Sequence, residues 1–239
     1  MKITIGHLFY DLLNLYGENG NVMALEKALS SQGIKVEIKE FSLTNEPWNL
    51  EDLDLLYVGA GTEHNQMLAL STLMKYKEEI TQMIMNNKFF ICTGNSIELF
   101  GKYIDCNGEN IETLGIFDYT TERTKKRIVS ECIFNYEEID AKILGFENHQ
   151  GKFTGITEPL FTVEKGFSSD LYSKVEGFRK NNFYGTYLLG PILVRNPKFL
   201  EKICKDLILS KDASFEFKEF DFDIAQKAHD KFLSKYYKD

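Results

Sequence analysis

The chain has little of what several protein classes require. It has only four prolines in 239 residues and no low-complexity stretch or evident repeat, which excludes proline-rich and repeat architectures. Its four cysteines, Cys92, Cys106, Cys132 and Cys204, form no C-x-x-C pair, so their spacing favours neither a zinc site nor a disulfide framework. No run of eighteen apolar residues occurs, and the polar N-terminus does not match a secretory signal. We therefore expect a cytoplasmic protein with free thiols and no membrane insertion.

Positive charge and nucleotide-binding motifs are also scarce. The net charge of -8 argues against a general nucleic-acid binder, which needs a basic face for phosphates. No G-x-x-x-x-G-K-[ST] phosphate loop is present, so any ATP chemistry has to come from another subunit. No metal-binding motif is evident, and we expect neither a metal nor a cofactor. The hydrophobic share of 43% and the charged share of 27% are ordinary for a globular chain with a core.

The first half of the sequence alternates between strand and helix patterns. The expected strands are Lys2–Phe9, Lys35–Phe41, Leu53–Val58 and Phe89–Cys92, and the expected helices are Asn21–Gln32 and about Gln66–Asn87. Such alternation predicts a parallel sheet with helices on both faces.

The second half has more strands and fewer helices. The expected strands are Arg127–Phe134, Lys142–Asn148, Phe161–Lys165 and Phe183–Leu189, followed by a helix at about Lys198–Leu209. They predict an antiparallel extension of the sheet. A strand-helix extension is expected at about 212–239, where Phe215, Phe217 and Phe220 alternate before a charged helix. Whether that helix caps this fold or docks on a partner stays open. We predict one doubly wound α/β domain spanning 1–239.

Two strand ends carry residues suited to chemistry. Ligands of open parallel sheets bind at the carboxyl ends of the strands, where Gly59-Ala60-Gly61 and Cys92-Thr93-Gly94 are expected. A cysteine on a sharp strand-to-helix turn is exposed, and the helix N-terminus lowers its pKa. The N–H of Thr93 and the glycine-rich turn are candidates for an oxyanion hole. A cysteine on a buried strand is otherwise a core residue, and spacing alone leaves both interpretations open.

Several blocks together resemble one enzyme family. They are His7–Gly17 with Gly20-Asn21, Gly59–Gly61, Cys92–Gly94, Arg127, Gly145–Gly151 and Gly185–Pro191. These blocks are similar to H-L-Y-P-D-L-x-N-L-Y-G, G-G-G, C-G-G, G-F-E-N-H-x-G and G-T-Y-L-H-G-P of class I glutamine amidotransferases of the CobB/CobQ type. Within that family they resemble most the amidotransferase subunits of lipid II isoglutaminyl synthase. The similarity runs from residue 6 to about residue 197.

The resemblance implies a function and roles for individual residues. Cys92 falls at the nucleophile that forms a glutamyl thioester, Arg127 at an arginine that helps to hold glutamine, and Asn148 and His149 in the wall of the site. The implied partner is a Mur-ligase-like ATP-dependent synthetase that takes up the ammonia. The implied acceptor is a carboxylate, that of D-glutamate in a peptidoglycan precursor before that of cobyrinic acid.

The sequence departs from this pattern at the catalytic histidine. That histidine falls on Leu189, which cannot transfer a proton, and such transfer is worth about 10²–10⁴-fold in rate. The family block C-G-G-Y-Q-L-L-G also fits poorly after Cys92, because Gly101 comes two positions late. His64 is a candidate substitute proton carrier, and Glu63 and Glu98 are further candidates. Two hypotheses therefore stay open: a glutamine-hydrolysing subunit, and a catalytically lapsed homologue that binds glutamine or acts as a scaffold.

Overall fold

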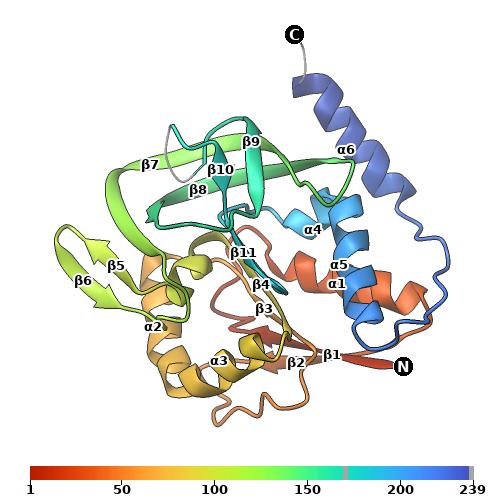
Figure 1. The fold of residues 1–239 in the computed structure, drawn as a ribbon, viewed down its shortest axis with the longest axis horizontal. Coiled ribbons are helices and arrows are strands. Elements are labelled where there is room, and N and C mark those ends of the chain that lie inside the picture. The colour runs from red at the N-terminus through yellow and green to blue at the C-terminus, as the bar shows by residue number, and fades with distance from the viewer. Residues whose placement is uncertain (169–171, 237–239) are drawn as a thin grey trace.

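The computed structural model describes residues 1–168 and 172–236, and its centre is a six-stranded sheet (Figure 1). The strand order is β11-β12-β4-β3-β1-β2, and every neighbouring pair is parallel except β11 with β12. The strands are β1 (Lys2–Leu8), β2 (Lys35–Phe41), β3 (Leu55–Val58), β4 (Phe89–Thr93), β11 (Phe178–Lys180) and β12 (Phe183–Thr186). The predicted mainly parallel α/β fold is confirmed.

Helices cover both faces of this sheet. They are α1 (Asn19–Ser31), α2 (Glu63–Leu73), α3 (Lys77–Met85), α4 (Ile192–Arg195) and α5 (Pro197–Leu209). On β3 and β4, Leu56 and Phe90 pack in one apolar cluster with α2 and α3, whereas Leu55 and Ile91 pack in a second cluster with α1 and α5. Alternate strand residues thus supply two cores, as expected for strands buried on both faces. The single helix expected over Gln66–Asn87 is two helices separated by a 3-10 turn at Met74–Tyr76.

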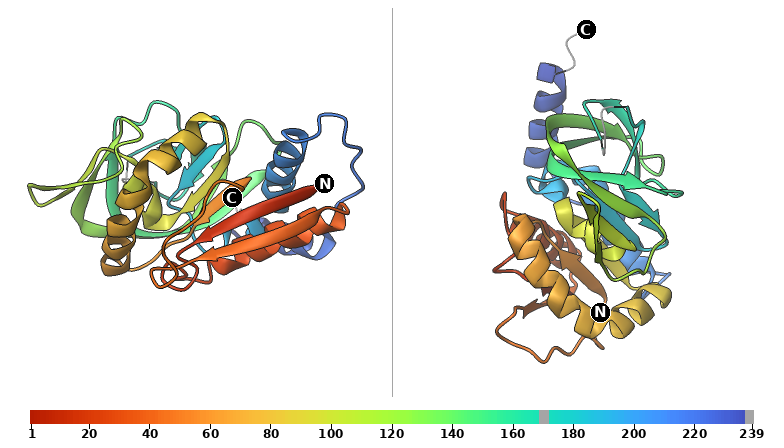
Figure 2. Two further views of the ribbon diagram at one scale, coloured as in Figure 1. Left: turned by 90° about the horizontal axis from the view of Figure 1, so that it is seen from below. Right: turned by 90° about the vertical axis from the view of Figure 1, so that its left-hand side faces the viewer.

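A second sheet lies beside the first (Figure 2), and its pairs are antiparallel except β5 with β7, which is parallel. Its order is β10-β9-β7-β5-β6, with β8 paired to β7. The strands are β5 (Tyr103–Cys106), β6 (Glu109–Glu112), β7 (Thr120–Asn135), β8 (Lys142–Thr154), β9 (Phe161–Lys165) and β10 (Val175–Glu176). β7 and β8 make a long ribbon whose register shifts between Arg123 and Ile128. An isolated antiparallel bridge joins Phe146 of the ribbon to Leu189, which follows β12 of the first sheet.

The C-terminal segment contains a helix but not the expected strand. Residues 214–222 pair with no strand in the described parts of the chain. The four phenylalanines of that segment instead pack, partly buried, against the cluster that contains α1 and α5. Their alternation therefore reflects burial of one side and not pairing. Helix α6 (Asp223–Tyr236) packs on this fold, since the buried His229 has its Nε2 atom 2.9 Å from the Lys142 carbonyl oxygen. Among the described residues, no helix is both long and apolar enough to cross a membrane.

Candidate active site

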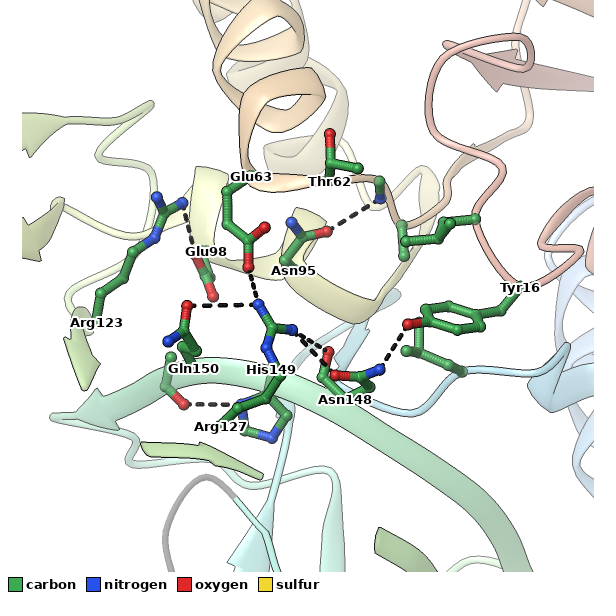
Figure 3. Close-up of a pocket in the computed structure, with 15 residues that line it drawn as sticks. Tyr16, Thr62, Glu63, Asn95, Glu98, Arg123, Arg127, Asn148, His149 and Gln150 are labelled. Atoms are coloured by element: carbon green, nitrogen blue, oxygen red, sulfur yellow. Dashed lines mark hydrogen bonds and ion pairs between the residues drawn. The ribbon is translucent and has the colours of Figure 1, made fainter. Parts of the chain in front are cut away.

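A cavity lies where the ribbon β7–β8 meets the carboxyl ends of the parallel strands (Figure 3). Its lining comes from segments far apart in the sequence: the loop after β1, the turn after β3, the start of α2, the 3-10 helix after β4, the ribbon, and Leu189. Of the residues predicted from the sequence, those that line it are Ala60, Gly61, Glu63, Glu98, Arg127, Asn148 and His149. Gly59, Cys92, Thr93 and His64 do not line it.

Cys92 lies inside β4 and not at its end. It pairs with Val58 on one side and Gly185 on the other, and the strand continues to Thr93. Its side chain is fully buried in the apolar cluster that includes Val58 and Phe90. Burial raises the pKa of the Cys92 thiol well above its ordinary value. The expectation that Cys92 ends its strand on an exposed turn is therefore wrong, because the buried ladder extends one residue further.

The strand-to-helix turn occurs at Gly94. This residue has φ +60° and separates β4 from the 3-10 helix Gly94–Phe100. A Cβ atom placed on Gly94 would lie 2.5 Å from the Ala60 Cβ and 2.6 Å from the Leu189 Cδ2. Counting back seven positions from Gly101 also gives Gly94, which is the spacing of the first and last residues in C-G-G-Y-Q-L-L-G. The position that corresponds to the nucleophile thus carries no side chain, and Ala60 and Leu189 fill the space in front of it.

One expected oxyanion donor, the Gly61 N–H, is already engaged, and the Thr93 side chain is buried. Thr93 is buried, and its hydroxyl lies 2.8 Å from the Tyr57 hydroxyl and donates to the Glu18 carboxylate. Gly61 N–H, from the glycine-rich turn, donates to Asn95 Oδ1 at 3.2 Å. Asn95 follows the turn residue Gly94, so a side-chain carboxamide of the protein occupies the N–H that a substrate oxygen would need.

Arg127 spans the mouth of the cavity. Its Nη2 forms an ion pair with Glu63 at the start of α2, and its Nη1 donates to Asn148 Oδ1 at 3.0 Å. Burial raises the pKa of Glu63, but the backbone N–H at the helix start and the Arg127 guanidinium outweigh burial, so the pKa lies below its ordinary value. Asn148 in turn donates to the Tyr16 hydroxyl at 2.6 Å. Polar contacts therefore join the ribbon across the cavity to the start of α2 and to the loop after β1 (Figure 3).

His149 is held as a neutral ring in the wall. It stacks on Tyr187 with ring centroids 3.7 Å apart, and its Nδ1 lies 2.9 Å from the Gly151 carbonyl oxygen. Burial lowers the pKa of His149 to about 4. His64, the candidate substitute proton carrier, is exposed on α2 outside the cavity lining. Leu189 stands where the family pattern has its histidine. Neither His149 nor His64 lies beside Gly94 to replace that histidine.

A second polar group, centred on Glu98, was not predicted as a group from the sequence. Glu98 is buried and accepts from Gln66 Nε2 at 2.9 Å and from the Tyr187 hydroxyl at 3.1 Å, while Arg123 lies 3.6 Å away and also contacts Gln66. Burial raises the pKa of Glu98, and the Arg123 guanidinium opposes this only in part. Spacing gives no signal for Gln66 and Arg123, because a helix start and a strand meet here only through the fold. No group of three or more metal-ligating side chains is found in the described chain.

Comparisons with known proteins agree on one family. The profile of the CobB/CobQ-like glutamine amidotransferase domain matches residues 4–197. The lipid II isoglutaminyl synthase (glutamine-hydrolyzing) subunit GatD of Staphylococcus aureus (strain N315) is 33% identical over 222 residues, covering 92% of this chain and 90% of that protein. The subunit of the same name from Streptococcus pneumoniae (strain ATCC BAA-255 / R6) is 29% identical, covering 88% and 82%. The structure of PurLQS from Thermotoga maritima shares the fold, with a TM-score of 0.56, 15% identity, and coverage of 88% of this chain and 99% of that one.

Proposed function

Because this chain belongs to the CobB/CobQ-like glutamine amidotransferase family, we propose that it is the amidotransferase-type subunit of an assembly like lipid II isoglutaminyl synthase. We propose further that it has lost glutamine hydrolysis and serves the assembly by binding its Mur-ligase-like synthetase. The names of both curated relatives support the assembly and, through it, the acceptor, a carboxylate of the lipid-linked peptidoglycan precursor. The geometry of the turn at Gly94 supports the loss of hydrolysis.

One observation carries the proposal. The left-handed turn that should present a nucleophile is Gly94, and the nearest side chains to its absent Cβ are Ala60 and Leu189. The family pattern has glycine at the position of Ala60 and histidine at that of Leu189. The nucleophile is therefore missing, its space is filled, and the proton carrier is missing too. Covalent catalysis needs an activated nucleophile within hydrogen-bond reach of a base, and neither is present at this turn.

Cys92 does not replace the missing nucleophile in this geometry. It packs beside Val58 in an apolar layer, and its raised pKa reduces the thiolate, which is the reactive form. Bringing it to the turn would require β4 to slide by two residues past β3 and β12, and such a slide breaks both ladders. The interior position of Cys92 is that of a small core residue.

The remaining part of a glutaminase site is also satisfied internally. Asn95 Oδ1 takes the Gly61 N–H, and the Arg127 guanidinium is engaged by Glu63 and Asn148. A glutamine molecule would have to displace these contacts, and no covalent bond to the protein would offset the free energy lost with them. On this proposal the synthetase draws on free ammonia for its ATP-dependent amidation.

The decisive experiment measures glutamate release from glutamine by the purified chain, alone and with the Mur-ligase-like synthetase of the same organism. We expect no release above buffer in either case, a stable complex by size-exclusion chromatography with light scattering, and amidation of lipid II with ammonium chloride but not with glutamine. The Staphylococcus aureus relative with its own synthetase is the positive control. Glutamate release that disappears in Cys92→Ala would overturn the proposed loss of hydrolysis. Absence of a complex would overturn the proposed partner.

A further inference from the structure

Three buried polar atoms without partners lie together on the inner face of the ribbon. Glu147 and His149 are two positions apart on β8, so their side chains point to the same face, and His149 stacks there on Tyr187. Glu147 is fully buried and His149 is 3% exposed. Both oxygens of Glu147 and the Nε2 of His149 have no hydrogen-bond partner among the described residues. Buried polar groups are normally satisfied, so these atoms point to a partner that the chain does not supply.

The contacts of His149 fix which of its ring nitrogens carries the proton. Nδ1 lies 2.9 Å from the Gly151 carbonyl oxygen, which only accepts, so Nδ1 is the donor. Burial lowers the pKa of His149 to about 4, so the ring is neutral at neutral pH and Nε2 carries a lone pair. That lone pair lies 3.7 Å from Glu147 Oε2, which is also an acceptor. Two acceptors at this separation need a donor that they share.

A proton on Glu147 does not meet this need. Burial raises the pKa of Glu147 well above its ordinary value, and the nearby Cys132 thiol opposes this only in part. A hydrogen bond, however, spans about 2.5–3.2 Å between its heavy atoms. At 3.7 Å a protonated Oε2 leaves the His149 lone pair unsatisfied, and Oε1 is left without a partner as well. The partner of these atoms therefore has several donors.

The charge of the surroundings favours a cation over a water molecule. Glu176 on β10 is also buried, and it accepts from the Tyr187 N–H at 2.7 Å and from the Thr186 hydroxyl at 2.8 Å. Burial, and next the nearby Glu147, raise the pKa of Glu176 to about 8. Within the described residues the group in ion-pair range of Glu147 is the neutral His149, and no lysine or arginine pairs with it. A buried carboxylate is costly unless a cation compensates it.

We propose that Glu147 and His149 bind an ammonium ion, with Glu176 adding to the negative field around it. Ammonium has four N–H donors and a positive charge, so one ion can donate to both Glu147 oxygens and to His149 Nε2. A metal ion fits less well, because it takes four or more ligands and no cluster of three metal-ligating side chains occurs in the described chain.

The site lies behind the wall of the cavity, since His149 lines the cavity and Glu147 does not. The binding of ammonium stands on these contacts alone. Only its purpose, a supply of the nitrogen donor to the synthetase, rests on the proposed function.

Thermal unfolding of the chain alone measures the binding. The Tm is followed by circular dichroism at neutral pH in about 100 mM ammonium chloride, and in the same concentration of sodium, potassium or tetramethylammonium chloride. A ligand that binds only the native chain raises its Tm, and an ion with a dissociation constant of about 10 mM adds about 3–6 °C under these conditions. We expect that rise with ammonium, a smaller rise with potassium, and none with tetramethylammonium, which has no N–H donor. No rise with ammonium, or an equal rise with potassium, would overturn the proposal.

Glu147→Gln is the matching variant, because it keeps the shape of the side chain and removes its charge. It should lose the ammonium effect, whereas Glu109→Gln, the same change at an exposed position of β6, should keep it. His149→Phe keeps a ring against Tyr187 without the lone pair and should weaken the effect. An undiminished ammonium effect in both site variants would refute the assignment to these residues.

Proton NMR with ¹⁵N-labelled ammonium chloride gives a second readout that does not depend on stability. The unmodified chain and Glu109→Gln should broaden the ammonium resonance, and Glu147→Gln should not. Equal broadening by all three chains would overturn the site. Glutamate release by the chain would overturn the proposed loss of hydrolysis and leave this result standing, so the two failures are distinguishable.

Discussion

Adding a side chain at Gly94 should be costly unless its neighbours are reduced at the same time. Gly94→Cys places a Cβ atom 2.5 Å from the Ala60 Cβ, on a residue with φ +60°. Ala60→Gly removes that neighbour and leaves the Ala60 Cα at 3.6 Å, an ordinary van der Waals separation. The Leu189 Cδ2 at 2.6 Å is the end of a flexible side chain that can rotate away. The two substitutions should therefore be coupled.

The magnitudes follow from these contacts. A left-handed backbone costs a residue with a Cβ about 1–2 kcal/mol, and overpacking costs about 1–3 kcal/mol. Gly94→Cys alone should therefore lower the free energy of unfolding by about 2–5 kcal/mol. Ala60→Gly alone should cost about 1 kcal/mol. The double variant should lose about 1–2 kcal/mol less than the sum of the single losses, since the packing clash is removed and the backbone strain is kept.

The assay is a double-mutant cycle of thermal unfolding followed by circular dichroism. For a chain of this size 1 kcal/mol corresponds to about 2–4 °C, so the coupling should appear as a Tm about 2–8 °C above the additive value. A parallel cycle with Gly94→Ala has the same Cβ without the thiol and should give the same coupling. Additive Tm changes in both cycles would refute the reasoning that Ala60 fills the space of a nucleophile.

Three further predictions concern single groups. In the native chain Cys92 should react with a thiol reagent more slowly than the half-buried Cys106, and fully only after unfolding; equal native rates, read by peptide mapping, would contradict its burial. Burial raises the pKa of Glu176 from its ordinary value of 4.5 to about 8, so its contribution to stability is present below pH 4.5 and is lost as pH rises to about 8. The Tm of the unmodified chain should fall more steeply from pH 6.5 to pH 8 than that of Glu176→Gln, and parallel curves would refute this. Arg127→Ala removes a half-exposed ion pair with Glu63 and should cost only about 0.2–1 kcal/mol, measured by urea unfolding; a loss above about 2 kcal/mol would mean that the bridge holds the two sheets together.

The convergence of the site residues was predictable from the sequence, but the turn was not. Gly61 follows a buried parallel strand, and the carboxyl ends of such strands meet at one edge, so its place in the cavity follows from the fold class. The last residue of β4 is not visible in the same way, because Phe89–Thr93 is buried throughout and alternation gives no end point. The late position of Gly101 is the sequence signal from which the turn at Gly94 could have been placed.

Other differences arise from long-range packing. The ribbon β7–β8 was predicted as shorter strands, since its exposed bulge at 124–127 interrupts the apolar pattern. The aromatic alternation around Phe217 predicted a strand, but pairing requires a free sheet edge nearby, and the segment instead packs on helices. Sequence patterns report which side chains are buried, whereas the partner that buries them is decided by the fold.

Packing is the best explanation for the retained family blocks. Sequence similarity in these blocks is therefore no evidence of glutamine hydrolysis. In the G-F-E-N-H block, Gly145 lies so close to Leu188 that a Cβ atom would clash with that side chain, and His149 stacks on Tyr187. In the N-terminal block, Asn21 accepts from the Leu193 N–H at 2.8 Å. These contacts join the ribbon and the helices to the parallel sheet whether or not glutamine is hydrolysed. The proposed loss of chemistry at the turn and at Leu189 would leave these contacts under the same structural requirement, and the family match over residues 4–197 is expected from the fold that they hold together.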